Sequence, residues 1–154
     1  MNEDKSREYF LKRQLLVLTE EMQSILDHAQ EGYPHEVVGI LAGSRSEHTV
    51  LKVLPLINER GETTNRYKVG PLKLMRAEQE LEAQGYDILG YYHSHPDHPS
   101  RYSEYDKAHA LPNLSYLIVS VRSGQAGEIQ SWRLREDRSV MDEESVLTLS
   151  KKHS

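Results

Sequence analysis

Apolar residues recur at helical spacing in two stretches of the chain. The first predicted helix begins at the N-cap residue Thr19 and ends at Gly32. Its buried face consists of apolar residues at positions i, i+3, i+4 and i+7, namely Met22, Ile25, Leu26 and Ala29. The second predicted helix covers 72–84, with Pro71 at its start and Gly85 after its end. Both helices are therefore expected to pack one face against the rest of the domain.

Short apolar runs bounded by glycine, proline or polar residues predict the strands. The predicted strands cover 37–42, 49–57, 86–93, 116–121 and 128–135. Pro55 has no N–H group, so it indicates a bulge or an edge position in the second of these strands. The last two strands are expected to form a β-hairpin that turns around Ser123-Gly124 and Gly127.

Four further segments complete the predicted order of elements. They are a polar loop at 58–65, a short strand at 67–69, a helix from the N-cap Ser103 to about Leu111, and a last strand or short helix at 139–149. Because helices mix with consecutive strands, the pattern favours an α+β or three-layer α/β domain over a regular βαβ alternation. One domain is expected over 14–149, between a charged tail at 1–13 and a short tail at 150–154.

Composition and charge exclude several classes of function. The 154-residue chain has a net charge of −5 and no run of Lys or Arg, which disfavours sequence-independent binding to nucleic acid. No apolar run approaches the roughly 20 residues that span a bilayer, so no membrane segment is expected. The chain contains no cysteine, which excludes a thiol nucleophile and a cysteine-ligated zinc site and fits a cytoplasmic protein.

The strand predicted at 86–93 leads directly into a stretch rich in metal-ligating side chains. His93 and His95 are two residues apart, so on an extended segment both imidazoles point to the same side. Asp106 follows in the first turn of the helix that Ser103 is expected to cap. Two imidazoles and one carboxylate form a three-ligand set that suits a catalytic zinc ion. The sequence therefore predicts a metallohydrolase.

Each of these residues also has a simpler interpretation. A His-x-His pair alone is usually two surface histidines on a strand, and Ser103 alone is an ordinary helix N-cap, although it can serve both roles. His98 is expected to face solvent. A zinc hydrolase also needs a proton acceptor. The candidate is Glu36, whose place before an apolar strand equally fits a solvated strand end.

The spacing of these residues resembles the signature of the JAMM (MPN+) metalloprotease domain. That signature is a Glu before an apolar strand, then His-x-His-Pro, six residues, Ser, two residues and Asp. In this sequence the corresponding positions are occupied by Glu36, His93, His95, Pro96, Ser103 and Asp106. The resemblance extends over about residues 15–134.

This resemblance implies a fold, a cofactor and a role for each residue. The implied fold is a mixed β-sheet flanked by helices, with zinc at a sheet edge. His93, His95 and Asp106 would bind Zn²⁺. Glu36 would orient and deprotonate the attacking water, and Ser103 would hydrogen-bond the developing oxyanion.

The compact chain resembles small bacterial members of the family more than the eukaryotic members that remove ubiquitin. Those small members are associated with ubiquitin-like sulfur-carrier proteins that end in Gly-Gly. The expected function is therefore hydrolysis of the peptide bond after that Gly-Gly tail. Two alternatives are a non-catalytic MPN-type scaffold and a DNA-repair-associated relative. The complete ligand set counts against the first and the acidic net charge counts against the second.

Overall fold

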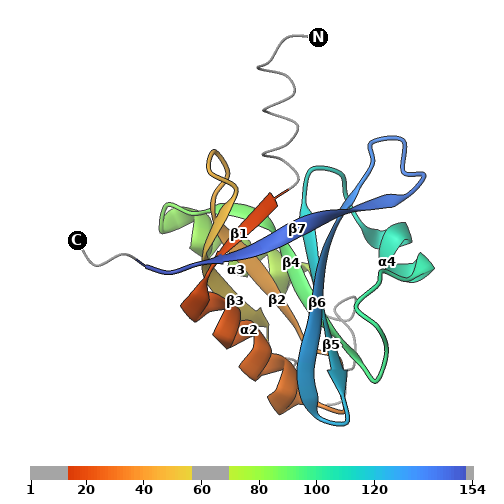
Figure 1. Ribbon diagram of the computed structural model, residues 1–154. Coiled ribbons are helices and arrows are strands. Elements are labelled where there is room, and N and C mark those ends of the chain that lie inside the picture. Colours follow the sequence, from red (N-terminus) through yellow and green to blue (C-terminus); the bar gives the residue numbers. More distant parts are fainter. Residues whose placement is uncertain (1–13, 57–69, 152–154) are drawn as a thin grey trace.

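Seven strands and three helices follow one another in the computed structural model, which describes residues 14–56 and 70–151 (Figure 1). The strands are β1 (Gln14–Leu18), β2 (Val38–Ser44), β3 (Thr49–Leu56), β4 (Asp87–Pro96), β5 (Ser115–Arg122), β6 (Gln125–Leu134) and β7 (Met141–Leu149). The helices are α2 (Thr19–Gly32), α3 (Pro71–Ala83) and α4 (Glu104–His109). The expected loop at 58–65, the expected strand at 67–69 and the expected tail at 1–13 lie outside the described residues, as do residues 152–154 of the tail expected at 150–154.

The strands form one mixed sheet in the order β1-β3-β2-β4-β5-β6-β7. The pairs β4–β5, β1–β3 and β1–β7 are parallel, and the remaining pairs are antiparallel. The last strand returns to pair with the first, which closes the sheet into a barrel (Figure 1). The expected mixed α+β domain is thus confirmed. Among the described helices, none is both long and apolar enough to cross a membrane.

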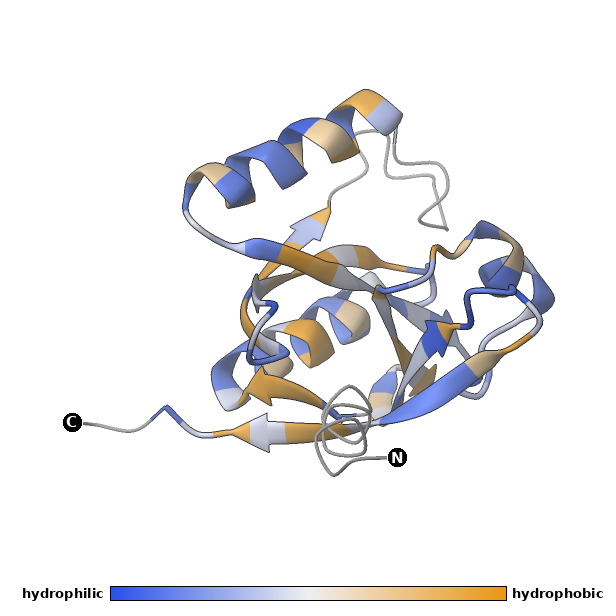
Figure 2. Cartoon of the chain, turned by 90° about the horizontal axis from the view of Figure 1, so that it is seen from above, coloured by the Kyte–Doolittle hydropathy of each residue, from blue (hydrophilic) through white to orange (hydrophobic). Residues whose placement is uncertain are grey.

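The curved sheet has a helix on each of its faces. Neighbouring residues of one strand contact different helices, because alternate side chains point to opposite sides of the sheet. Leu41 of β2 packs in the core cluster that contains Ile25 and Ala29 of α2. Its neighbour Ile40 packs in a second cluster with Leu81 of α3. Figure 2 shows the two long helices on opposite sides of the central strands. The apolar stripe predicted for α2 therefore faces the sheet, whereas in α3 Leu81 is buried and Leu72 and Met75 are exposed.

Helix α2 also covers two strand segments that lack a neighbouring strand on one side. Strand β1 pairs with only the first two residues of β3, and β7 pairs with only the last four residues of β6. The Val53 N–H of β3 donates to Glu21 Oε1 at 2.8 Å, and the Ala126 N–H of β6 donates to Gln30 Oε1 at 3.0 Å. Pro55 lies on the same open part of β3, as its missing N–H predicted. These contacts satisfy backbone groups that would otherwise form an exposed sheet edge.

Several element boundaries differ from those expected, and two of these differences change the predicted role of a residue. The prediction that Thr19 caps the first helix is wrong, because β1 runs into α2 without a loop and Leu18 occupies the N-cap position. The prediction that Gly127 shares the hairpin turn is also wrong, because β6 begins at Gln125. The turn consists of Ser123 and Gly124, whose φ angles of 49° and 84° match a two-residue turn with both central residues in the left-handed region.

Gly39 provides a direct test of packing between β2 and β4. It lies opposite the fully buried Tyr92, and a Cβ atom at position 39 would overlap the Tyr92 ring. The ring cannot easily move, because the Tyr92 hydroxyl is 2.7 Å from His28 Nδ1 of α2. We expect Gly39→Ala to lower the free energy of unfolding by about 1–3 kcal/mol through overpacking.

Urea denaturation of Gly39→Ala and Gly127→Ala checks this expectation. Gly127 is also a strand glycine, but it is exposed and its added Cβ would meet no atom within 4 Å. The control should therefore change the free energy of unfolding by less than about 0.5 kcal/mol. Equal destabilisation by the two substitutions would show that overlap with Tyr92 is not the cause.

Candidate metal centre

Strand β4 carries both histidines of the predicted site. Extended backbone places His93 and His95 on the same face of the sheet. The strand has a hydrogen-bonded neighbour on each side, with Val38 of β2 and Ile118 of β5 both in register with His93. The two histidines thus lie at the carboxyl end of an interior strand. The resemblance implied a metal site at a sheet edge. The histidines lie where β4 ends, but β4 itself is not an edge strand, because it is paired on both sides.

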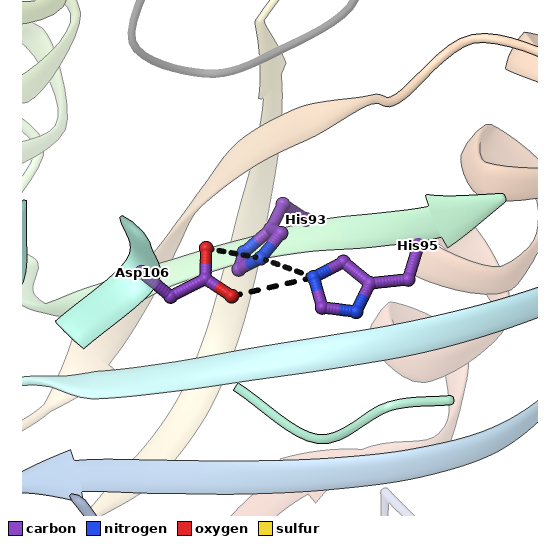
Figure 3. Close-up of side chains that lie close together, drawn as sticks. All are labelled: His93, His95 and Asp106. Atoms are coloured by element: carbon purple, nitrogen blue, oxygen red, sulfur yellow. Dashed lines mark hydrogen bonds and ion pairs between the residues drawn. The ribbon is translucent and has the colours of Figure 1, made fainter. Parts of the chain in front are cut away.

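Three donor groups converge at this end of β4, and Figure 3 shows the Asp106 carboxylate pointing at both imidazole rings. His93 Nε2 lies 3.2 Å from Asp106 Oδ1, and His95 Nε2 lies 3.3 Å from Asp106 Oδ2. The two Nε2 atoms are 3.2 Å apart. The side chains are 0% (His93), 13% (His95) and 7% (Asp106) exposed, so a ligand entering the site meets mainly the His95 side.

A backbone carbonyl determines the tautomer of His95. His95 Nδ1 is 2.8 Å from the Pro99 carbonyl oxygen. A carbonyl can only accept a hydrogen bond, so Nδ1 carries the hydrogen and the Nε2 lone pair of the neutral ring faces the centre. Metal-binding histidines commonly have such a partner on their second nitrogen. The role of the Pro99 carbonyl could not be predicted from the sequence, because a main-chain acceptor leaves no signal in residue type.

The loop that carries Pro99 is held against the sheet by hydrogen bonds that are buried or partly buried. Ser100 is fully buried, and its hydroxyl donates to Glu128 Oε1 at 2.7 Å. Trp132 Nε1 donates to the Ser100 carbonyl at 2.9 Å. On the other side of Pro99, the Ser120 hydroxyl donates to the His98 carbonyl at 2.6 Å. The His98 side chain faces solvent, as expected.

Asp106 is oriented by a capping box at the start of α4. The Ser103 hydroxyl accepts from the Asp106 N–H at 3.0 Å, and the Ser103 N–H donates to Asp106 Oδ2 at 2.9 Å. The expected N-cap at Ser103 is therefore confirmed. Burial acts to raise the pKa of Asp106, but the adjacent imidazole groups of His93 and His95 outweigh it and hold that pKa well below its usual range. The carboxyl group thus stays ionised, as a metal ligand must be.

Glu36 lies beside this centre. It is half-buried and stands two residues before β2. The β2–β4 register pairs Val38 with His93, and its continuation brings Glu36 opposite His95. Burial alone would lower the pKa of His95, but Asp106, the Pro99 carbonyl and the charge of Glu36 together raise it. The structure therefore brings the predicted base next to the predicted ligands.

The chemistry of the donor set fits a divalent metal ion. Two imidazole nitrogens and one carboxylate oxygen, all within 4.8 Å of one another, are a three-ligand set that leaves a coordination position for water or substrate. His93, His95 and Asp106 can thus hold a metal. The exposed Ser103 stands at the same helix end as Asp106. The specific roles of these residues and of Glu36 stay predictions.

Sequence comparison places this geometry among known proteins. Residues 19–135 match the family of prokaryotic homologues of the JAB domain. Desampylase from Haloferax volcanii is 37% identical over 102 residues, and the alignment covers 63% of this chain and 73% of desampylase. A probable TtuB-protein conjugate cleaving protease from Thermus thermophilus is 36% identical over 91 residues, covering 59% of this chain and 60% of that protein. This chain therefore spans less than two thirds of the Thermus protein.

Solved structures share the same architecture. The solution structure of a protein from Desulfitobacterium hafniense has a TM-score of 0.74 and 29% identity, covering 89% of this chain and 94% of that chain. The structure of JAMM, described as a metalloprotease-like zinc site in the proteasome and signalosome, has a TM-score of 0.52 and 16% identity, covering 86% and 97%. The second likeness concerns the fold alone. With the family match over most of its length, this chain belongs to the prokaryotic JAB-domain family, of the JAMM (MPN+) type.

Proposed function

We propose that this protein is a zinc-dependent isopeptidase that hydrolyses the bond after the C-terminal Gly-Gly of a ubiquitin-like sulfur-carrier protein. The convergence of His93, His95 and Asp106, with Glu36 alongside, is the observation that carries this proposal. The coarser class is established, because the family match and two relatives named for cleavage make the chain a hydrolase of the JAMM type. Action in the cytoplasm is part of the proposal and is consistent with a chain that has no cysteine.

Each residue of the site has its own proposed role in peptide hydrolysis. His93, His95 and Asp106 would hold zinc, which when bound polarises a carbonyl and makes water acidic near neutral pH. Glu36 is the proposed base, taking a proton from the attacking water and delivering it to the departing amine nitrogen.

Ser103 is the proposed donor to the developing oxyanion. Its hydroxyl oxygen already accepts the Asp106 N–H, so its hydroxyl hydrogen remains available to be donated. A helix cap and an oxyanion donor are therefore compatible roles for this exposed side chain.

The names of the relatives support the substrate class. One relative is named desampylase and the other is named as a probable protease that cleaves TtuB-protein conjugates, and these names support a protein conjugate of a ubiquitin-like carrier as the proposed substrate. A narrow path to the site that admits only glycine would select a Gly-Gly tail, because any Cβ would clash there. A scaffold without activity has no need for three converging metal donors, two of them buried, so the catalytic proposal is preferred.

The test uses a ubiquitin-like carrier protein extended after its Gly-Gly by a short reporter peptide. We expect the zinc-loaded protein to release the reporter and to leave a carrier that ends in Gly-Gly, as read by mass spectrometry. A chelator should stop the reaction, and added zinc should restore it. A carrier ending in Ala-Ala before the reporter is the matched control and should stay intact. Cleavage that persists without metal, or that ignores the Ala-Ala change, would contradict the proposal.

A further inference from the structure

We propose that Ser94, the residue between the two histidines, is a positioning residue that holds Glu36 in place for the reaction. This inference rests on the proposed function, in which Glu36 is the base. By strand alternation the Ser94 side chain points to the face opposite that of His93 and His95, so it is not a candidate ligand. Ser94 is nevertheless a fully buried hydroxyl, and a buried hydroxyl needs a hydrogen-bond partner.

The partner of Ser94 is the residue next to Glu36. The Val37 N–H donates to Ser94 Oγ at 2.9 Å, and the Ser94 N–H donates to the Val37 carbonyl at 3.1 Å. In a regular antiparallel pair both acceptors would be backbone carbonyls. Here the serine hydroxyl takes the place of one carbonyl, at the pair that directly follows the last ladder pair, Val38–His93. The side chain thus extends the β2–β4 pairing by one residue.

This extension determines where Glu36 can be. With Val37 bonded to Ser94, the chain just before it runs antiparallel to β4 and Glu36 comes opposite His95. The influence of the Glu36 charge on His95 agrees with that placement. A second hydrogen bond joins the two segments further from Glu36, where the Tyr33 hydroxyl donates to Asp97 Oδ2 at 2.7 Å. That hydrogen bond is exposed, and Tyr33 is three residues from Glu36. The buried bond between Val37 and Ser94 therefore restrains the position of Glu36 more directly.

The first experiment measures kcat and KM of zinc-loaded Ser94→Ala on the Gly-Gly-extended carrier. A displaced base loses rate without losing substrate binding, so we expect kcat to fall by roughly 10-fold to 100-fold while KM changes little. Bound zinc should stay at the wild-type stoichiometry, because the three ligands are untouched. Ser94→Thr keeps the hydroxyl and should recover most of kcat.

Ser131→Ala is the matched control for loss of a buried serine hydroxyl. Ser131 is also fully buried and donates to Glu144 Oε1 at 2.7 Å, but it lies on β6 outside the site. It should lower stability without lowering kcat, when both variants are assayed well below their unfolding temperatures. An equal loss of kcat in Ser131→Ala would mean that general destabilisation explains the effect, and would overturn the inference.

Amide hydrogen exchange at Val37 gives a readout that needs no activity and does not depend on whether threonine fits. The Val37 N–H should exchange at least about 10-fold faster in Ser94→Ala, while the Ile40 and Leu41 amides of β2 keep their protection. Unchanged Val37 exchange, or unchanged kcat in Ser94→Ala, would refute the positioning role. If the wild-type protein cleaves no carrier, the proposed function fails instead, and the two failures are thus distinguishable.

Discussion

Replacing Glu36 with glutamine is expected to lower kcat on a Gly-Gly-extended carrier by about 10²–10⁴-fold, the usual contribution of a general base. Glutamine keeps the size of the side chain but cannot accept a proton from water. KM and zinc stoichiometry should change little, because Glu36 is not among the three converging donors. Steady-state kinetics on the zinc-loaded variant, with the metal content measured on the same sample, provide the check.

Glu31→Gln is the matched control for this substitution. Glu31 is an exposed carboxylate on α2, five residues before Glu36, and it has no place in the site. The control removes the same charge and should leave kcat at the wild-type value. A Glu36→Gln protein that cleaves as fast as wild type would show that another group takes the proton, and it would remove the central role assigned to Glu36.

Replacing Asp106 with alanine is expected to abolish stoichiometric zinc binding and, with it, measurable cleavage. The change removes one of three donors, and with it the carboxylate that contacts both His93 and His95. Removal of an ionised ligand also removes the charge that attracts the cation. Elemental analysis of the protein after dialysis against zinc-containing buffer measures the first effect, and the carrier assay measures the second.

Asp106 also belongs to the capping box, so loss of the helix cap must be separated from loss of the ligand. Ser103→Ala removes the capping hydroxyl while it leaves all three donors in place. We expect this variant to lose about 1 kcal/mol of stability and to bind zinc normally. Full zinc occupancy in Asp106→Ala would contradict the predicted ligand set, whereas zinc loss in Ser103→Ala would assign the effect to helix α4.

Most of the secondary structure could be predicted from local patterns. The apolar spacing in α2 and α3 and the apolar runs of β2 and β5 are local properties, and each matches the structure closely. The segment 139–149 was ambiguous between strand and helix, because its alternation is weak. Strand pairing makes this segment a strand, because β7 pairs with β6 through its first half and with β1 through its second half. Partner strands remote in sequence therefore decided what the local pattern left open.

The sequence by itself determined which groups are available at the site. The two-residue spacing of His93 and His95 on a strand makes both imidazoles face one side, and the interval from Ser103 to Asp106 specifies a capping box. Both are local geometric consequences of residue type and order. The absence of cysteine and the acidic charge removed rival chemistries in the same way.

Only the tertiary structure decided how these groups meet. Glu36 precedes His95 by 59 positions, and the β2–β4 register, extended by the Ser94 hydroxyl, brings them together. The Pro99 carbonyl selects the His95 tautomer, yet the loop that presents it is held by Ser100 and the remote Trp132. Register and main-chain contacts depend on strands that are distant in sequence. Residue types therefore predict the ligands and the base, while their alignment into one centre follows from the folded sheet.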